Sequence, residues 1–505
     1  MSTVNNKIDV RCINGSPGIF NTEGQNNYYP LSMTSNPAIC NEELCTLGYN
    51  YAMITWATPK RPADTTICFG ENPERLTKHT VNQNTEYHWV EIYGLIPSTR
   101  YWYRVESNEV KGSLNSFTTL PKPEGKHLFN YAIFSDTHIA STNPVKDINE
   151  TYFGKLVEHS KTLLTQCIMD SKRRNIDLAV ITGDLTDTAN QKQYLELRDQ
   201  ILPCFGNTPY LLCIGNHDKF TKNSGIGEKG FLDYVSNREK TCANFVFRDY
   251  QFILLDSCRQ NDNWGYIYPT HLQWTKNILQ SEGKPSYLFF HHPCNGPDLW
   301  FGVKNHKDFL KTIRPFSCVQ GVFSGHIHRN KVTVNHIATG NLPYVEIPAT
   351  VQFPCAYAIV QVFESGFIYN SYKVSRLDLS EMSRGRFILK HRGNAILTWY
   401  GFGGIGDRCF SYSNNQLFRP ARYELAVTLD QQRAIKFYQR VQSFDGASLT
   451  CSNNINNLKV VLGHHDSHSL AFRSYYDKFS HFNINAMISK EGNYDLPQNI
   501  KLLIE

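Results

Sequence analysis

The sequence predicts an α/β protein with a layered α/β core, preceded by an all-β region and followed by a region that mixes helices and strands. From residue 127 to 375, β-prone apolar runs alternate with segments of helical periodicity, which is typical of α/β cores. From residue 46 to 122, short β-like runs recur at roughly ten-residue spacing between turn residues, which is typical of an antiparallel sandwich. The chain of 505 residues is also too long for one typical domain, so two or three domains are expected.

Residues 1–45 are rich in Asn, Ser, Pro and Gly and lack periodicity, so they are expected to form an irregular arm. Residues 46–122 are predicted to form a small antiparallel β-sandwich. The segment Gly94–Tyr101 carries Leu-x-Pro-x-Thr-x-Tyr and resembles the corner of fibronectin type III sandwiches. The N-terminal domain is therefore expected to be fibronectin III-like.

Residues 127–375 are expected to form a catalytic domain in which helices and strands alternate. Apolar residues at helical spacing predict helices over 153–174, 193–201 and 271–279. Two β-prone runs, 244–248 and 250–255, predict a hairpin. Further on, the runs 344–347 and 356–362 are expected to be antiparallel strands that close a second sheet.

Residues 376–505 form a third region, which is expected to serve in recognition, packing or assembly. A protein partner is expected to bind through this region. A β-like run covers 395–399, and Thr428 with Gln431 resembles a capping box before a helix. The cluster His464-His465-Asp466-Ser467-His468 fits no standard zinc spacing, so a polar loop is favoured over a metal site.

The composition excludes several classes of partner and location. The net charge of +6 comes with no Lys/Arg-rich block, so nothing points clearly to nucleic acid or to a membrane. The N-terminus has no basic start followed by an apolar run, and no apolar run approaches the ~18 residues of a membrane span. The 14 scattered cysteines favour reduced buried thiols over a disulfide framework. A cytoplasmic location is expected, and secretion without a cleavable signal stays open.

One stretch organises the candidate chemistry, the run Ile181–Asp187. An apolar β-prone segment over 177–182 leads into Gly183, where the backbone can turn sharply. Asp184 is thereby expected at the C-terminal tip of a buried strand. In open α/β sheets that tip is where ligands bind.

Four other strand-like runs also end in residues that can hold a metal. These endings are Asp136-x-His138, Asn216-His217-Asp218, His291-His292 and His326-x-His328. Carboxylate and imidazole ligands in one site suit Mn, Fe or Zn rather than Ca. Two such ions ~3.5–4 Å apart can bind both oxygens of an in-line phosphoryl displacement and lower the pKa of a bridging water towards 7.

The five motifs, in this order, resemble the calcineurin-like metallophosphoesterase superfamily. The resemblance implies a four-layer α-β-β-α sandwich and two metal ions with Asp184 bridging them. The implied ligands are Asp136, His138 and His328 for one ion, and Asn216, His291 and His326 for the other. It further implies that His217 faces the substrate, that Asp218 orients His217, and that His292 supports the ligands from behind.

A β-sandwich ahead of such a core resembles the purple acid phosphatases, but the site departs from theirs. Those enzymes place a Tyr ligand three residues after the bridging Asp, where this chain has Asp187. Their first motif lacks the counterpart of His138, and they have Glu where this chain has Asp218. The site is more similar to the Asp-x-His type of class III cyclic nucleotide and glycerophosphodiester phosphodiesterases.

The expected function is a dinuclear metal-dependent phosphoesterase, a hydrolase in which hydroxide formed at two Mn, Fe or Zn ions attacks a phosphomonoester or phosphodiester. The alternative is a catalytically weak module on the same fold, acting as a binding or scaffold protein through its β-sandwich and C-terminal domains. Loss of activity usually shows as missing ligands, and here every position is filled. The sequence therefore favours the enzyme.

Overall fold

The computed structural model describes thirteen stretches of the chain. They are 8–14, 39–108, 110–112, 114–140, 154–222, 224–294, 302–334, 342–391, 405–420, 423–429, 448–451, 458–464 and 485–488. The chain divides into two compact units, which are described separately below. The first unit comprises Met1–Lys122, Arg376–Ser411 and Phe418–Glu505, and the second comprises Pro123–Ser375 and Tyr412–Leu417. The division into an arm, a sandwich, a catalytic and a C-terminal domain at the boundaries given above stays a prediction.

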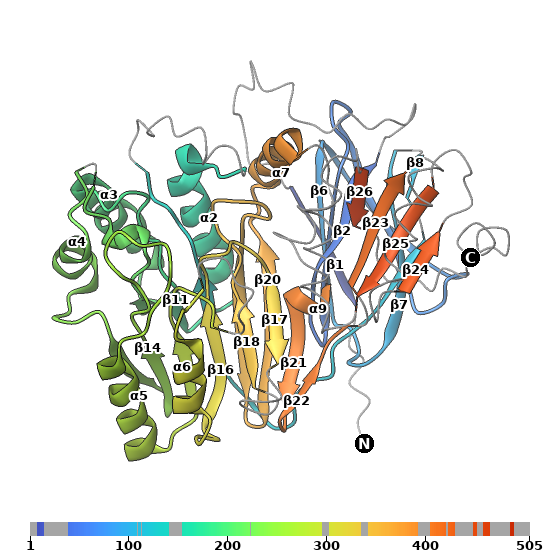
Figure 1. The fold of residues 1–505 in the computed structure, drawn as a ribbon. Helices are drawn as coiled ribbons and strands as arrows, with labels where there is room; N and C mark the ends of the chain where they lie inside the picture. Colours follow the sequence, from blue (N-terminus) through green and yellow to red (C-terminus); the bar gives the residue numbers. More distant parts are fainter. Residues whose placement is uncertain are drawn as a thin grey trace. The chain divides into compact units, whose positions relative to one another are not determined.

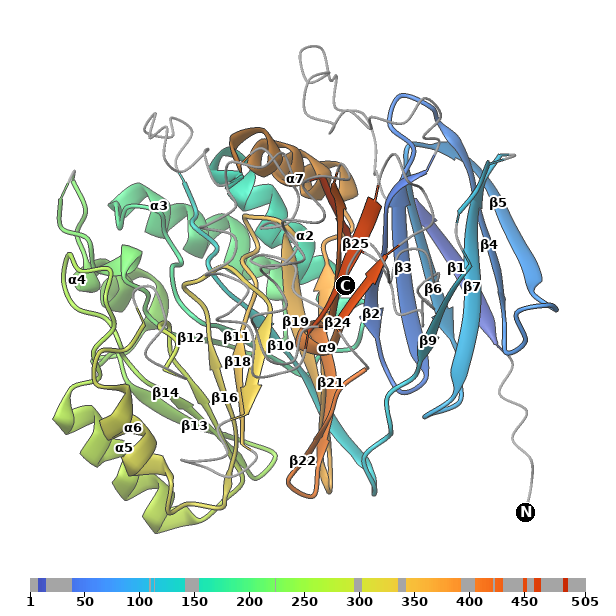
Figure 2. The same cartoon turned by 45° about the vertical axis from the view of Figure 1, so that its right-hand side comes forward.

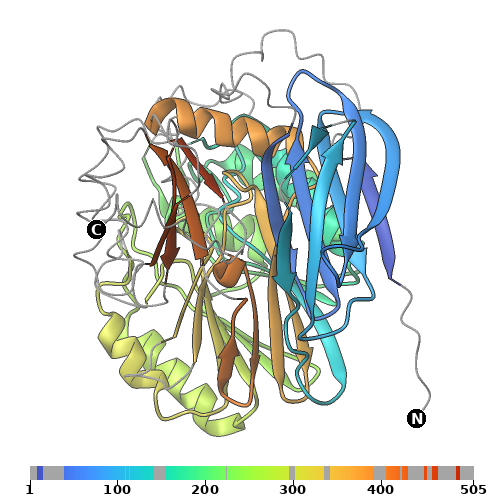
Figure 3. The ribbon, with the colours of Figure 1, turned by 90° about the vertical axis from the view of Figure 1, so that its right-hand side faces the viewer.

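The first unit contains two antiparallel sheets built from the β-like runs of its N-terminal part (Figure 3, blue). One sheet has the order β1-β6-β3-β2, and the other β5-β4-β7-β8 with β9 also paired to β7. The strands are β1 (Asp9–Asn14), β2 (Cys40–Leu47), β3 (Tyr51–Ala57), β4 (Ala63–Gly70), β5 (Thr77–Thr85), β6 (Tyr87–Tyr93), β7 (Arg100–Ser107), β8 (Val110–Lys111) and β9 (Asn115–Thr118). The Trp56 indole of one sheet donates to Ser107 Oγ of the other at 2.9 Å.

The corner predicted at Gly94–Tyr101 has the expected hydrogen bond. The Ile96 main-chain N–H donates to the Tyr101 hydroxyl at 3.0 Å, and the Tyr101 ring is fully buried. This bond from a tyrosine near a strand start to the backbone just upstream is typical of such sandwiches. The assignment to the fibronectin III type itself stays a prediction.

The remainder of the first unit contains helices α7 (Leu377–His391) and α9 (Ile405–Arg408) and a sheet of order β24-β25-β23-β26. These strands are β23 (Tyr423–Leu429), β24 (Ser448–Cys451), β25 (Leu458–His464) and β26 (Asn485–Ile488). Thr428 therefore lies in a strand, and its predicted role as a helix cap is wrong. The expected helix after residue 430, the run 395–399 and residues 465–468 of the His-rich cluster lie outside the described residues.

The second unit contains two mixed sheets. The seven-stranded sheet has the order β12-β11-β10-β19-β20-β21-β22, and the six-stranded sheet β13-β14-β15-β16-β18-β17. The strands of the first are β10 (His127–Phe134), β11 (Leu178–Ile181), β12 (Tyr210–Leu212), β19 (Ala356–Phe363), β20 (Gly366–Lys373), β21 (Cys409–Ser413) and β22 (Gln416–Phe418). Those of the second are β13 (Ala243–Phe247), β14 (Tyr250–Leu254), β15 (Ser286–Phe289), β16 (Val319–Ser324), β17 (Lys331–Val334) and β18 (Pro343–Glu346).

The predicted hairpin is confirmed as β13 and β14, which pair antiparallel from Ala243↔Leu254 to Phe247↔Tyr250. The prediction that 344–347 and 356–362 pair in one sheet is wrong. Strand β18 runs parallel to β16 in the six-stranded sheet, whereas β19 runs antiparallel to β10 in the other. Both runs are mostly apolar and lack a clear alternation of apolar and polar residues, so hydrophobic periodicity could not show which sheet each run joins.

An aromatic layer joins the two sheets of the second unit. The ring of Tyr131 on β10 lies 5.2 Å from Phe252 on β14 and 5.3 Å from Tyr287 on β15, measured between centroids. On the opposite face of the six-stranded sheet, buried residues such as Leu288 and Val322 pack with Leu272. The six-stranded sheet is therefore covered by aromatic rings on one side and by helices on the other.

The helices complete a four-layer α/β arrangement, as the sequence predicts. Helices α5 (Pro269–Glu282) and α6 (His306–Ile313) lie side by side against the six-stranded sheet (Figures 1 and 2). Helix α2 (Ser160–Lys172) packs on β19 of the seven-stranded sheet, and α3 (Gln191–Glu196) continues as a π-helical segment to Ile201. No helix within the described stretches is long and apolar enough to cross a membrane.

Candidate dinuclear metal centre

The five motifs meet because parallel strands end at one edge of each sheet. Strands β10, β11 and β12 are parallel neighbours, and so are β15 and β16. Short hydrogen bonds tie the loops just beyond these ends. The Asp136 N–H donates to the Gly183 carbonyl at 3.1 Å, and the Gly325 N–H donates to the His291 carbonyl at 2.9 Å. The local sequence thus places each residue just after the end of a strand, and the parallel pairing of the strands brings these ends together.

The backbone turns sharply at these tips. Five site residues have positive φ: Asp136 (51°), His138 (42°), Asp184 (49°), His326 (71°) and His328 (55°). Gly183, which precedes Asp184, has φ 100°, as its role in a sharp turn requires. Non-glycine residues rarely adopt this region, and such conformations gather at functional sites.

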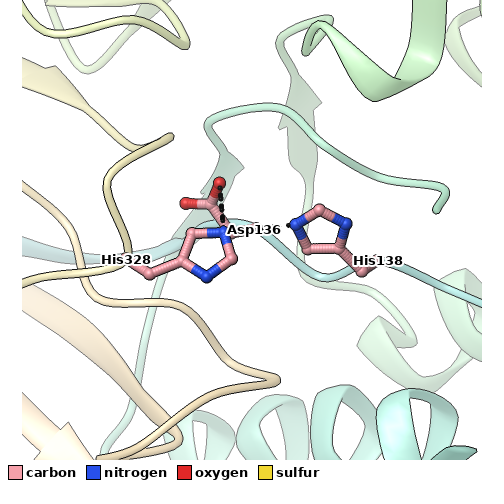
Figure 4. Close-up of side chains that lie close together, drawn as sticks. All are labelled: Asp136, His138 and His328. Carbon is pink, nitrogen blue, oxygen red and sulfur yellow. Dashed lines mark hydrogen bonds and ion pairs between the residues drawn. The ribbon is translucent and has the colours of Figure 1, made fainter. Parts of the chain in front are cut away.

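The first cluster consists of Asp136, His138 and His328, shown in Figure 4. His328 Nε2 lies 3.3 Å from Asp136 Oδ1, and His138 Nε2 lies 3.2 Å from His328 Nε2. All three side chains are buried. Their donor atoms lie within 4.8 Å of one another, which is the spacing that one ion could span.

The second cluster consists of Asp184, His291 and His326, with Asn216 beside them. His291 Nε2 lies 3.2 Å from Asp184 Oδ2, 3.2 Å from His326 Nδ1 and 3.0 Å from Asn216 Oδ1. Asp184 Oδ2 also lies 3.6 Å from His138 Nε2 of the first cluster. The Asp184 carboxylate therefore stands between the two clusters.

Hydrogen-bond acceptors behind three histidines fix which ring nitrogen faces the cluster. The acceptors of the Nδ1–H groups are Asp187 Oδ1 for His138 (3.2 Å), the Thr182 carbonyl for His291 (3.0 Å) and Gln352 Oε1 for His328 (2.5 Å). A proton held on Nδ1 leaves the Nε2 lone pair to face the cluster, as metal-binding histidines require. The Asn216 amide is oriented in the same way, because its Nδ2 donates to Asn263 Oδ1 at 3.3 Å.

Burial and charge make this a site for cations. Burial, reinforced by the Lys155 ammonium, holds the pKa of His138 well below its usual value, and burial also lowers the pKa of His326. Burial opposes ionisation of Asp184, yet the neighbouring His291 holds the Asp184 pKa well below its usual value. Burial opposes charge on His291, yet Asp184 and Asp136 raise its pKa to about 9, so the carboxylates of this buried cage favour positive charge within it.

His217 lies at the edge of the cage and is only half-buried. Its Nδ1–H donates to the Asp187 carbonyl at 2.6 Å, and its main-chain N–H donates to Asp184 Oδ1 at 2.9 Å. The ring centroid lies 4.6 Å from that of His138 and 4.6 Å from that of Phe220. His217 is thus half-buried beside the ligands, and its side chain forms a third close group with His138 and Asp187.

Asp218 has a different task from the one expected. Its carboxylate accepts hydrogen bonds from the N–H groups of Leu185, Thr186 and Gly215 at 3.0, 2.9 and 2.9 Å, and from Thr186 Oγ1 at 2.8 Å. These bonds fasten the loop after β11 to the loop after β12. The expectation that Asp218 orients the His217 ring is corrected, because the group that holds His217 Nδ1 is the Asp187 carbonyl.

His292 is buried directly behind the second cluster, as a supporting residue would be. Its Nδ1 lies 3.0 Å from Ser257 Oγ, and its ring centroid lies 4.4 Å from that of His326. Gly265 packs so closely that a Cβ there would lie 2.6 Å from the His292 Cβ. His292 therefore has little freedom to move.

Three residues of the site were missed by sequence reasoning, namely Asp187, Asn263 and Gln352. Asp187 has a signal in its position three residues after Asp184, but that position predicts only the absence of a Tyr ligand and not a hydrogen bond to His138. Asn263 and Gln352 lie in loops without a motif, so nothing in the sequence could have singled them out.

The fold and the paired clusters define a metal-dependent hydrolase of phosphate esters. Residues 129–330 match the family model described as calcineurin-like phosphoesterase. The chain thus contains a calcineurin-like phosphoesterase domain, and its clusters supply a site for two metal ions.

Proteins of known description resemble this domain. A probable cyclic nucleotide phosphodiesterase from Moraxella catarrhalis is 28% identical over 42% of this chain and 75% of its own length. A probable glycerophosphodiester phosphodiesterase from Arcobacter nitrofigilis is 25% identical over 40% of this chain and 72% of its own. The crystal structure of a dimetal phosphatase from Danio rerio aligns with 49% of this chain and 96% of its own at 14% identity, with a TM-score of 0.40.

Proposed function

We propose that the second unit hydrolyses phosphodiesters at two transition-metal ions drawn from Mn, Fe and Zn. The observation that carries this proposal is the position of Asp184, whose carboxylate stands within reach of both histidine clusters. The names of the relatives support the preference for diesters over monoesters, since both cited relatives are described as phosphodiesterases.

The proposed ligands follow the two clusters. One ion would be held by Asp136, His138 and His328, the other by Asn216, His291 and His326, and Asp184 would be shared. When bound, two such ions polarise the phosphoryl oxygens and lower the pKa of a water between them towards 7. Asp187, Thr182 and Gln352 would keep the three imidazole rings aimed at the ions.

His217 is the proposed catalytic residue outside the ligand set. Its Nδ1–H is engaged by the Asp187 carbonyl, so its Nε2 is the nitrogen left to meet the substrate. A proton on Nε2 can pass to the leaving oxygen or stabilise charge on the phosphoryl group. Asp218 and His292 are proposed to act indirectly. Asp218 fixes the two loops, and His292 packs behind the ligand His326.

The direct test is metal content together with turnover. Protein loaded separately with Mn, Fe and Zn is expected to hold two ions per chain by elemental analysis and to hydrolyse bis(4-nitrophenyl) phosphate. His326→Ala and His328→Ala should each lower the metal content, because each removes a ligand from a different cluster. His306→Ala, on the helix α6 that covers the other face of the sheet, is the matched control and should keep both ions. One ion or none with every metal tried would contradict the proposal.

The colour of the iron-loaded protein tests the position of Asp187. Its carboxylate lies 3.2 Å from His138 Nδ1, on the side of the ring away from the cluster. With no tyrosine supplied from this position, the iron-loaded protein should lack strong tyrosinate-to-iron absorption in the mid-visible region. A purple protein would mean that a tyrosine from elsewhere reaches the iron.

A further inference from the structure

Two partly exposed aromatic residues lie in the loops next to Asn216 and His217. Phe220 follows His217 by three residues, and Trp264 follows Asn263, the partner of the Asn216 amide. Neither ring takes part in holding the metal cage. Ligand sites combine a few polar groups with aromatic and apolar side chains, which is the arrangement at this edge of the cage.

Phe220 lies against the proposed catalytic histidine. The Phe220 and His217 ring centroids are 4.6 Å apart, and the two planes are tilted by 45°. The Phe220 N–H donates to the His217 carbonyl at 3.3 Å, which fixes the two residues in one short turn. Phe220 is therefore next to the residue proposed to meet the leaving oxygen, where the organic group of an ester can reach it.

Trp264 belongs to the loop that borders the second cluster. The Asn216 side chain donates to Asn263 at 3.3 Å, and the neighbouring Gly265 packs on His292, so this loop borders the site. The Lys304 ammonium lies 5.3 Å from the Trp264 ring centroid, in a cation–π arrangement. An aromatic ring and a positive charge next to each other suit an ester that carries both an apolar ring and a negative phosphate.

The two loops that carry these rings are fastened together. The Thr221 N–H donates to Asn261 Oδ1 at 2.9 Å, and the Asn261 amide donates back to Thr221 Oγ1 at 2.7 Å. Gln260 Nε2 also donates to Thr221 Oγ1 at 3.1 Å. These hydrogen bonds hold the loop after His217 and the loop before Gly265 together, and the two loops, with Phe220 and Trp264, are called the wall below.

We infer that Phe220 and Trp264 are specificity-determining residues that contact the organic group of the ester and favour planar aromatic groups over small alkyl groups. This inference rests on the proposed function, because it takes the Asn216–His217 side of the cage as the place where the substrate binds. Aromatic rings in contact with one another gain attraction beyond that of simple burial, which a methyl or glyceryl group cannot match.

The experiment compares two phosphonates that differ only in this group. Phenylphosphonate and methylphosphonate are titrated into metal-loaded protein by calorimetry, so that the readout is Kd and not turnover. The native protein should bind phenylphosphonate about tenfold more tightly than methylphosphonate. In Phe220→Ala and Trp264→Ala this ratio should fall by about threefold to tenfold, while the Kd of methylphosphonate stays the same.

Two further sets of variants keep the result interpretable. Phe220→Leu and Trp264→Leu keep an apolar side chain at each position without the aromatic ring, so they should fold and keep both ions while still lowering the ratio. Tyr210→Leu, a partly exposed aromatic at the start of β12 that stacks on Phe205, is the control and should leave the ratio unchanged. An unchanged ratio in all four wall variants, or equal affinity for both phosphonates in the native protein, would overturn the inference. Failure of the proposed function would show separately, as absent turnover with two ions bound.

Discussion

Replacing His217 by alanine is expected to lower turnover by about 10²–10⁴ while both metal ions stay bound. The side chain of His217 belongs to neither proposed ligand set; it lies with His138 and Asp187 in a third group of close metal-capable side chains, and the bond that joins this residue to Asp184 comes from its main-chain N–H, which alanine retains. What disappears is a donor aimed at the charge that develops on the phosphoryl or leaving oxygen. Turnover should therefore fall without loss of metal.

The leaving group decides which role His217 has. A nitrophenolate needs little protonation, so bis(4-nitrophenyl) phosphate should suffer the smaller loss, and an alkyl diester, which leaves as a basic alkoxide, the larger one. An equal loss on both substrates would indicate charge stabilisation without proton transfer. Loss of ions from the variant, measured by elemental analysis, would instead make His217 a ligand. His271→Ala, on the partly exposed face of α5, serves as the control.

Asp184→Asn should cost the protein at least one ion and nearly all of its activity. The Asp184 carboxylate reaches 3.2 Å from His291 Nε2 and 3.6 Å from His138 Nε2, so it lies close to a histidine of each cluster. A neutral amide of the same shape cannot offset two adjacent dications, whose charges dominate the local field. The number of ions per chain, measured by elemental analysis, and the turnover should therefore fall together.

The matched control is the same change at a buried carboxylate far from the cage. Asp170 is buried on α2 and accepts hydrogen bonds from the main chain and hydroxyl of Ser375. Asp170→Asn should keep both ions, even where it lowers the free energy of unfolding. Two ions and normal turnover in Asp184→Asn would show that the bridging assignment is wrong.

The sequence was sufficient to predict the strand tips and the residues on them, because both depend on short local patterns. An apolar run followed by Gly183-Asp184 shows that a strand ends and that a carboxylate follows, whatever the rest of the chain does. The layered α/β core and helices α2 and α5 were predictable for the same reason, since helical periodicity is local.

The hydrogen-bond partners of side chains and the pairing partners of strands were not predictable, because they depend on which segments meet in three dimensions. Asp218 follows His217 directly, yet its carboxylate turns to the N–H groups of the loop after β11. Strands β18 and β19 are both buried and apolar, so nothing in either run selects its sheet. Thr428 carries a local signal for a helix cap, but it pairs in a strand instead, opposite Lys459 of β25.

The left-handed backbone at five residues of the site limits how this centre could be re-engineered for another metal. Asp, Asn and His accept positive φ more readily than other side chains, whereas a β-branched residue or a bulky one is strained there. A mutant library for altered metal preference should therefore confine Asp136, His138, Asp184, His326 and His328 to exchanges among Asp, Asn and His. Cysteine or glutamate, chemically attractive as ligands, would have to overcome the conformation of the chain before they could meet a metal.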